Sequence, residues 1–278
     1  MINIGSALTM AFWDNGMADF CPIYDFHAHM HELSDMYMPS REPEAMIETM
    51  MRCNTKLTVF CSHMALNFAE CEEEYNLNVV RRYPQYFKAY HAVIPNKTDF
   101  QITRRRIEDN ASCYLGFKFH CDGHKTALTD PAYAPFLEYM DYRGLPALLH
   151  TWGHSEYNGV DVIKTVAKKY PNAIFICGHS FHGDWRRGAE LGLECPNLYY
   201  ELTAVMDDYG AIELLCGTVG SERVLFGTDL PWFDTHHGIG AVLSADISDE
   251  DRHNILHRNG EKLLRKLGYW SSDINNVI

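Results

Sequence analysis

Short apolar segments alternate with longer amphipathic segments along nearly the whole chain. The apolar segments span residues 21–26, 56–63, 86–94, 114–120, 145–150, 173–179, 197–202 and 223–228. Their lengths and their turn-rich boundaries are typical of buried strands. The amphipathic segments span residues 43–51, 67–83, 99–110, 130–143, 160–170, 183–193, 207–219 and 248–267. Their apolar spacing predicts helices, and strict strand-helix alternation is typical of an α/β chain folded as a (β/α)8 TIM barrel.

The length of the chain agrees with one such barrel. The sequence has 278 residues, and barrels of this kind commonly contain about 250. No linker-like change of composition interrupts it, so we interpret residues 1–278 as a single domain. Residues 1–20 precede the first apolar segment and form a short N-terminal extension. We expect this extension to be a small hairpin or cap at one end of the barrel.

Potential metal ligands stand at the ends of four apolar segments. His27 and His29 end the first, His150 the fifth, His179 the sixth and Asp229 the eighth. Side chains two residues apart on a strand point to the same side, so His27 and His29 face one spot. The carboxyl ends of parallel strands meet at one mouth of a barrel, and imidazole and carboxylate groups are common zinc ligands. A lone histidine is usually structural, but the combination predicts a metal site.

The same motifs carry a resemblance to a known family. They read Asp-Phe-His-Ala-His at 25–29, Leu-Leu-His-Thr at 148–151, Gly-His-Ser at 178–180 and Gly-Thr-Asp-Leu-Pro at 227–231. In this order they resemble the amidohydrolase superfamily, in particular the amidohydrolase-related branch that includes aminocarboxymuconate-semialdehyde decarboxylase. The resemblance extends from residue 24 to residue 267. Two details differ: His-Ser-Phe-His-Gly replaces a His-x-Gly-Gly pattern after strand six, and Gly260 replaces a residue such as Ala.

The resemblance implies roles for the strand-end residues. His27, His29, His150 and Asp229 would hold one divalent metal ion, with zinc as the first choice and Mn, Fe or Co as alternatives. Asp229 would also accept a proton from a metal-activated water. His179 would be the general acid or base beside the metal.

Other arrangements of the site remain open at this stage. His179 is a direct ligand in one of them. In another, a carboxylated Lys118 bridges a second metal, whereas the simpler alternative pairs the Lys118 amine with Glu201. We place His120 at the rim as a substrate contact or an additional ligand.

Aromatic and basic residues follow the fifth and sixth strands at the same mouth. Trp152 and Arg186, together with Lys118 and His120, are the candidate substrate-binding residues. Aromatic walls with a few cations suit a small planar or carboxylated substrate.

Three functions are compatible with these residues. The first is a metal-dependent hydrolase acting on a small amide, lactone or ester. The second is a nonoxidative decarboxylase or hydratase, a lyase, that uses the same metal. The third is a barrel that binds a metal or ligand without catalysis, which has no need of an acid/base such as His179.

The net charge and the cysteine content indicate which binding partners and which cellular compartment to expect for the protein. The formal net charge of −13 argues against nucleic acid or an anionic membrane surface as a partner. The odd total of nine cysteines without a Cys-x-x-Cys pair favours reduced thiols. No signal peptide or membrane span is recognised, so we expect a cytoplasmic protein with a small-molecule substrate. The resemblance is compatible with a homodimer.

Overall fold

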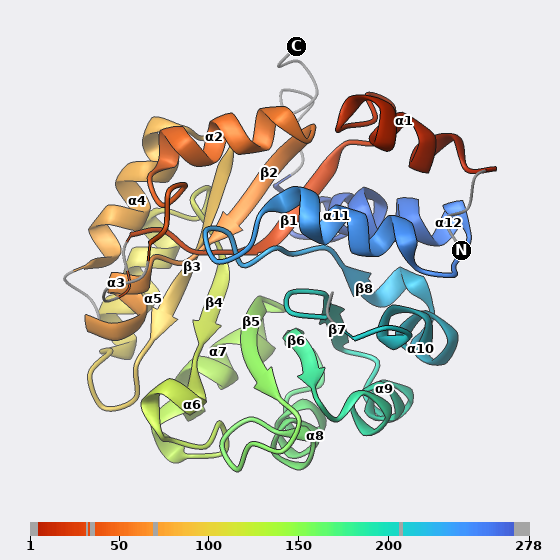
Figure 1. Cartoon of the computed structure of the whole chain (residues 1–278). Coiled ribbons are helices and arrows are strands. Elements are labelled where there is room, and N and C mark those ends of the chain that lie inside the picture. The colour runs from red at the N-terminus through yellow and green to blue at the C-terminus, as the bar shows by residue number, and fades with distance from the viewer. Residues whose placement is uncertain (1–4, 32, 34–36, 69–71, 206–207, 270–278) are drawn as a thin grey trace.

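The computed structural model describes residues 5–31, 33, 37–68, 72–205 and 208–269. Eight parallel strands pair in chain order. They are β1 (Ile23–Ala28), β2 (Thr55–Phe60), β3 (Phe87–Val93), β4 (Tyr114–Phe119), β5 (Pro146–Trp152), β6 (Ile174–His182), β7 (Leu198–Glu201) and β8 (Val224–Leu225). The sheet closes because the Phe26 N–H donates to the Phe226 carbonyl at 3.0 Å and Ala28 bridges Leu230. The predicted (β/α)8 TIM barrel is confirmed (Figure 1).

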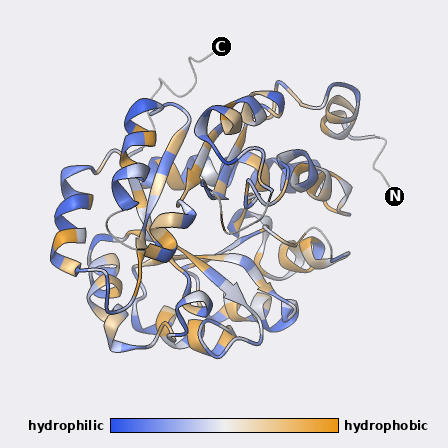
Figure 2. Ribbon diagram, turned by 60° about the vertical axis from the view of Figure 1, so that its left-hand side comes forward, coloured by the Kyte–Doolittle hydropathy of each residue, from blue (hydrophilic) through white to orange (hydrophobic). Residues whose placement is uncertain are grey.

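Helices surround the barrel. They are α1 (Ala7–Asn15), α2 (Pro43–Arg52), α3 (His63–Phe68), α4 (Glu73–Arg82), α5 (Phe100–Asp109), α6 (Cys121–His124), α7 (Ala134–Arg143), α8 (Val160–Lys169), α9 (Trp185–Glu194), α10 (Ala211–Val219), α11 (Thr235–Ser244), α12 (Asp249–His253) and α13 (Asn259–Lys266). Shorter turns are η2 (Pro131–Tyr133), η3 (Ser221–Arg223) and the π-helical η4 (Asn254–Arg258). In α8 the buried residues Val160, Ile163, Val166 and Ala167 recur at helical spacing. Figure 2 shows the resulting mixture of hydrophilic and hydrophobic residues along the outer helices.

Several predicted elements differ from the structure. The segment 67–83 is not one helix, because α3 begins at His63 and ends at Phe68, before α4. The Ser62 hydroxyl accepts a hydrogen bond from the Ala65 N–H at 3.2 Å and so starts α3 directly after β2. Helix α11 was not predicted, since its glycines lower its intrinsic helix propensity. Strand β8 is shorter than 223–228, and the start predicted at 207 for the seventh helix lies outside the described residues.

The N-terminal extension contains the helix α1, so a hairpin was the wrong alternative. The Asn54 side chain, just before β2, donates to the carbonyls of Ala18, Asp19 and Cys21 at 3.0–3.3 Å. These bonds fix the extension at the amino-terminal ends of β1 and β2. Helix α1 then packs beside α11, where the Phe12 ring lies 5.7 Å from the His236 ring (Figure 1). The extension is therefore remote from the carboxyl ends of the strands.

Two further findings bear on the predicted class of protein. Within the described residues, every helix is too short or too polar to cross a lipid bilayer. Eight of the nine cysteines are described, and each is a free thiol. Cys71 lies outside the described residues.

Candidate metal centre

Three side chains from the first and last strands converge at the carboxyl end of the barrel. Asp229 Oδ1 lies 3.0 Å from His29 Nε2 and 3.2 Å from His27 Nε2. His27 is on β1 and His29 directly follows it, while Asp229 follows β8, which closes against β1. The predicted convergence of these three residues is observed.

The second nitrogen of each imidazole has an acceptor. His27 Nδ1 lies 2.7 Å from Glu201 Oε2, and His29 Nδ1 lies 2.8 Å from the Cys61 carbonyl oxygen. These acceptors assign the ring protons to Nδ1, so each Nε2 presents a lone pair to Asp229. Burial lowers the pKa of His27 well below its ordinary value, which keeps that ring neutral. Two lone pairs facing a carboxylate oxygen repel one another, and a divalent cation between them turns the repulsion into coordination.

The Asp229 carboxylate faces both imidazoles. Its Oδ1 atom is buried and has no hydrogen-bond partner among the described residues. Ionised oxygen and neutral imidazole nitrogen are the donors that zinc and related divalent metals prefer. The residues present therefore fit a divalent metal ion.

Lys118 approaches the same centre from β4. Its Nζ lies 2.8 Å from His27 Nε2, and its side chain is fully buried. Burial lowers the pKa of Lys118 to about 8, with Asp229 opposing the shift. Glu201, which we considered as a partner of Lys118, instead accepts from His27 and from the Thr203 N–H at 2.6 Å. Lys118 thus places a positive charge beside the ligand atoms.

His179 lies on the other side of this centre. Its donor atom and those of His27 and Asp229 all lie within 4.8 Å of one another. His179 Nε2 also lies 3.0 Å from His150 Nδ1. The His150 ring also stacks on His120 at 4.2 Å. The geometry accommodates His179 either as a ligand or as a neighbouring acid/base, and the ligand role of His150 stays a prediction.

Both predicted catalytic residues have left-handed backbones. The φ angles are +64° at His179 and +61° at Asp229, and Ser180 and Phe181 continue the left-handed turn. This conformation costs roughly 1–2 kcal/mol per residue and is concentrated at functional sites. The Ser180 hydroxyl donates to the Glu201 carbonyl at 2.8 Å, and the Asp229 N–H donates to the His27 carbonyl at 2.7 Å. These bonds hold both side chains at the mouth of the barrel.

A cavity of about 300 Å³ lies over the centre. Its lining residues are His29, Leu33, His63, Leu66, Asn67, His120, Gly123, His124, His150, Trp152, His179, Ala204, Asp229, Trp232 and Phe233. His120 and Trp152 line the cavity, and their contact with a substrate stays a prediction. Lys118 is buried and lines no part of the cavity, and Arg186 is exposed on α9, away from it. Leu33 comes from the loop that follows the first strand.

His63 was missed by the sequence analysis. Its ring stacks on His29 at 4.7 Å, and its Nε2 accepts a hydrogen bond from Trp232 Nε1 at 2.9 Å. Its position as the last residue of the second predicted strand could have identified it as a site residue. Burial lowers the pKa of His63 to about 3, so this ring is a neutral wall of the site.

Comparison with known proteins identifies the family of the chain. A family model described as amidohydrolase matches residues 24–266. No curated protein matches the chain. Among solved structures, an uncharacterised TIM-barrel protein of Bordetella bronchiseptica has a TM-score of 0.73 at 16% identity, covering 89% of this chain and 99% of its own.

Two further structural neighbours have named activities. A 2,6-dihydroxybenzoate decarboxylase from Rhizobium has a TM-score of 0.70 at 14% identity, covering 88% of this chain and 99% of its own. A 5-carboxyvanillate decarboxylase from Novosphingobium aromaticivorans, in complex with manganese, has a TM-score of 0.70 at 11% identity, covering 88% and 96%. At these identities the likeness to solved structures shows only the fold. The family model matches residues 24–266 and so shows the family. The chain therefore belongs to the amidohydrolase family of metal-dependent enzymes.

Proposed function

We propose that this chain is a metal-dependent hydrolase of a small amide, lactone or ester. The observation that carries the proposal is the position of Asp229 Oδ1, which lies 3.2 Å from His27 Nε2 and 3.0 Å from His29 Nε2. A divalent ion held there supplies Lewis-acid activation of water near neutral pH. Zinc is our first choice, and manganese, iron and cobalt are alternatives.

His179 supplies proton transfer in this proposal. Burial lowers its pKa to about 3, so its ring is neutral. His179 Nδ1 is buried without a hydrogen-bond partner among the described residues, although the ring lines the cavity. A buried unpaired ring nitrogen is costly unless a ligand or water engages it. Its Nε2 meets His150 Nδ1, which fixes the ring orientation.

The cavity limits the size and charge of the substrate. Its volume of about 300 Å³ is at the lower end for small-molecule sites. Its lining, within the part of the chain that the structure describes, contains no Lys or Arg. A substrate with several negative charges would lack compensation there, so a neutral or singly charged molecule fits best.

A nonoxidative decarboxylase is the second candidate. Four rings, of His120, His150, Trp152 and His182, stack in sequence with interplanar angles of 10°, 5° and 9°. Three of these rings, those of His120, His150 and Trp152, line the cavity, where they can contact a planar aromatic acid. Two structural neighbours act on such acids, according to their names. A barrel that binds without turnover is a poorer account, because it gives no reason for the left-handed placement of His179.

A substrate screen separates the candidates. The zinc-loaded protein is incubated with lactones, esters, amides and hydroxylated aromatic acids, while hydrolysis products and carbon dioxide are measured together. We expect hydrolysis of a small neutral or singly charged compound without release of carbon dioxide. Release of carbon dioxide without hydrolysis would replace the first candidate by the second. No turnover of any class by fully loaded protein would favour the binding-only barrel.

A further inference from the structure

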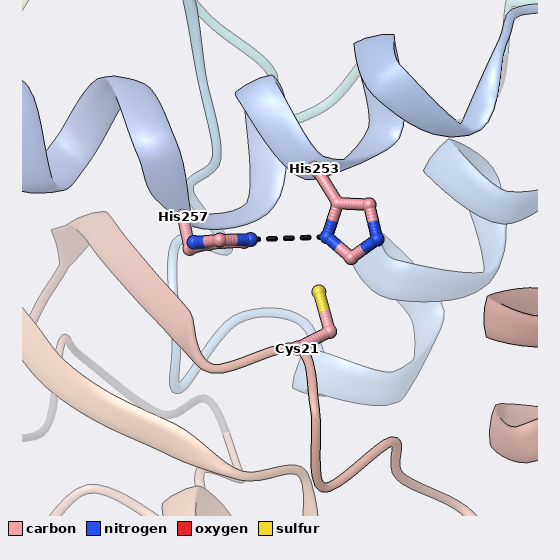
Figure 3. A group of neighbouring side chains, drawn as sticks. All are labelled: Cys21, His253 and His257. Carbon is pink, nitrogen blue, oxygen red and sulfur yellow. Dashed lines mark hydrogen bonds between the residues drawn. The ribbon is translucent and has the colours of Figure 1, made fainter.

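A second group of metal-binding side chains lies far from the catalytic centre. Cys21 precedes β1, His253 ends α12 and His257 belongs to η4 (Figure 3). Their donor atoms all lie within 4.8 Å of one another, and His253 Nδ1 is 3.0 Å from His257 Nε2. Cys21 is at the amino-terminal end of β1, whereas His27 and His29 are at its carboxyl end. The two groups are thus separated by the length of the strand.

The helix spacing is suited to a metal. His253 and His257 are four residues apart, so both side chains lie on one face of the helix. The turn between them is π-helical, with the Asn259 N–H donating to the Asn254 carbonyl. Such turns are uncommon and are frequent at functional sites.

A glycine brings this helix close to β1. A Cβ at Gly260 would lie 2.6 Å from the Phe26 ring and 3.0 Å from Tyr24 Cβ. A residue with a side chain would therefore push α13 away from the strand. The close approach is what brings Cys21 within reach of two histidines more than two hundred residues later in the chain.

The hydrogen bonds around His257 leave its lone pair toward the group. His257 Nδ1 lies 3.0 Å from Glu261 Oε1, which assigns the ring proton to Nδ1 and the lone pair to Nε2. A carboxylate behind a histidine is the usual arrangement around bound zinc, because it fixes the ring and increases its basicity. His253 Nδ1 and His257 Nε2 share a hydrogen bond at 3.0 Å, which a bound ion would replace (Figure 3). This separation is close to the edge of a tetrahedron with Zn–N bonds of about 2.1 Å, which is roughly 3.4 Å.

The three side chains differ in their exposure to solvent. Cys21 is buried, while His253 and His257 are half-buried, so an ion can reach the sulfur past the two rings. A thiolate with two imidazoles is a soft to borderline donor set, which selects zinc over magnesium or calcium.

We propose that Cys21, His253 and His257 bind one zinc ion as a structural site, with a fourth position for water. Bound zinc links the segment before the first strand to the helix that ends the barrel. It stabilises the folded chain because the three ligands are brought together only on folding.

Cobalt substitution of the full-length protein tests the proposal. A cysteine thiolate bound to Co2+ gives a charge-transfer absorption that imidazole and carboxylate ligands do not give. We expect two cobalt ions per chain and this absorption in the unsubstituted protein. Cys21→Ser and His257→Gln should each bind one ion and lose the absorption.

Matched variants identify the source of the signal. Cys216→Ser removes a half-buried thiol elsewhere and should retain both ions and the absorption. His29→Gln should lose the catalytic ion and keep the absorption. An unchanged absorption in Cys21→Ser, or a single ion without absorption in the unsubstituted protein, would overturn the proposal.

A second measurement does not depend on the cysteine variant. Addition of zinc should raise the thermal unfolding temperature of His29→Gln, and the rise should vanish in the double variant His29→Gln, His253→Gln. The metal-free proteins should unfold at similar temperatures, which separates lost metal binding from a damaged fold. An equal rise in both proteins would contradict a zinc site at His253.

Discussion

Lys118 Nζ lies 2.8 Å from His27 Nε2, the same nitrogen that faces the Asp229 carboxylate. The ammonium group of Lys118 and a divalent metal therefore compete for one lone pair. Burial lowers the pKa of Lys118 to about 8, so the group is still largely protonated at pH 7. Two unit charges of like sign about 4 Å apart repel by about 4 kcal/mol at an effective dielectric constant of about 20, and for an ammonium group and a divalent ion the repulsion is about 8 kcal/mol.

The first prediction follows from this repulsion. Lys118→Met should bind zinc at least about tenfold more tightly at pH 7, measured by competition with a chelator. Lys88→Met, which removes a lysine that contacts the Ser112 carbonyl, should leave the affinity unchanged. Loss of metal from Lys118→Met would show instead that a carboxylated Lys118 is a ligand.

The second prediction concerns the carboxylate behind His27. Glu201→Gln removes the charge that orients His27 and holds its proton on Nδ1. We expect the zinc affinity to fall about 10- to 100-fold. Glu194→Gln is the matched control, since Glu194 pairs on the surface with Lys164 and Lys168. Equal affinities of the two variants would show that Glu201 does not support the metal ligand.

The third prediction separates the two roles open to His179. His179→Asn should lower turnover of an identified substrate by about 10²- to 10⁴-fold while keeping the metal content. His237→Asn changes an exposed histidine and should retain both. If metal analysis shows that His179→Asn has lost its catalytic ion, His179 is a ligand and the acid/base assignment is wrong.

The fourth prediction compares two helical glycines. Gly260→Ala places a Cβ 2.6 Å from the Phe26 ring, so it should destabilise the protein by about 1–3 kcal/mol. Gly217→Ala, in α10, meets nothing within 4 Å and should stabilise by up to about 1 kcal/mol. Denaturant unfolding of both variants measures the difference. A Gly260→Ala protein as stable as the unsubstituted one would refute the close helix approach.

The barrel and the main ligand candidates could be predicted from local patterns. Strand and helix periodicity is local, and the carboxyl ends of parallel strands always meet at one mouth. The convergence of His27, His29 and Asp229 therefore follows from strand positions, whereas their roles as ligands were implied by the family resemblance. Helix α11 does not, because its packing overrides the low helix propensity of its glycines.

Other features depend on tertiary contacts that no local pattern encodes. Glu201 contacts His27 and not Lys118. Side-chain packing across the barrel decides this pairing, and the sequence does not show it. Arg186 was expected at the cavity, yet the phase of α9 leaves it exposed. The left-handed turn at His179 is held by a bond between Ser180 and the Glu201 carbonyl, a contact between strands. His63 could be recognised as a strand-end histidine, but its ring contacts His29 and Trp232, which are distant in the sequence.

The metal centre is tested most directly by anomalous scattering from crystals of the zinc-loaded protein, recorded on both sides of the zinc absorption edge. The account predicts an anomalous peak about 2.0–2.2 Å from His27 Nε2, His29 Nε2 and a carboxylate oxygen of Asp229. A zinc-replete crystal without a peak between these three side chains would contradict it.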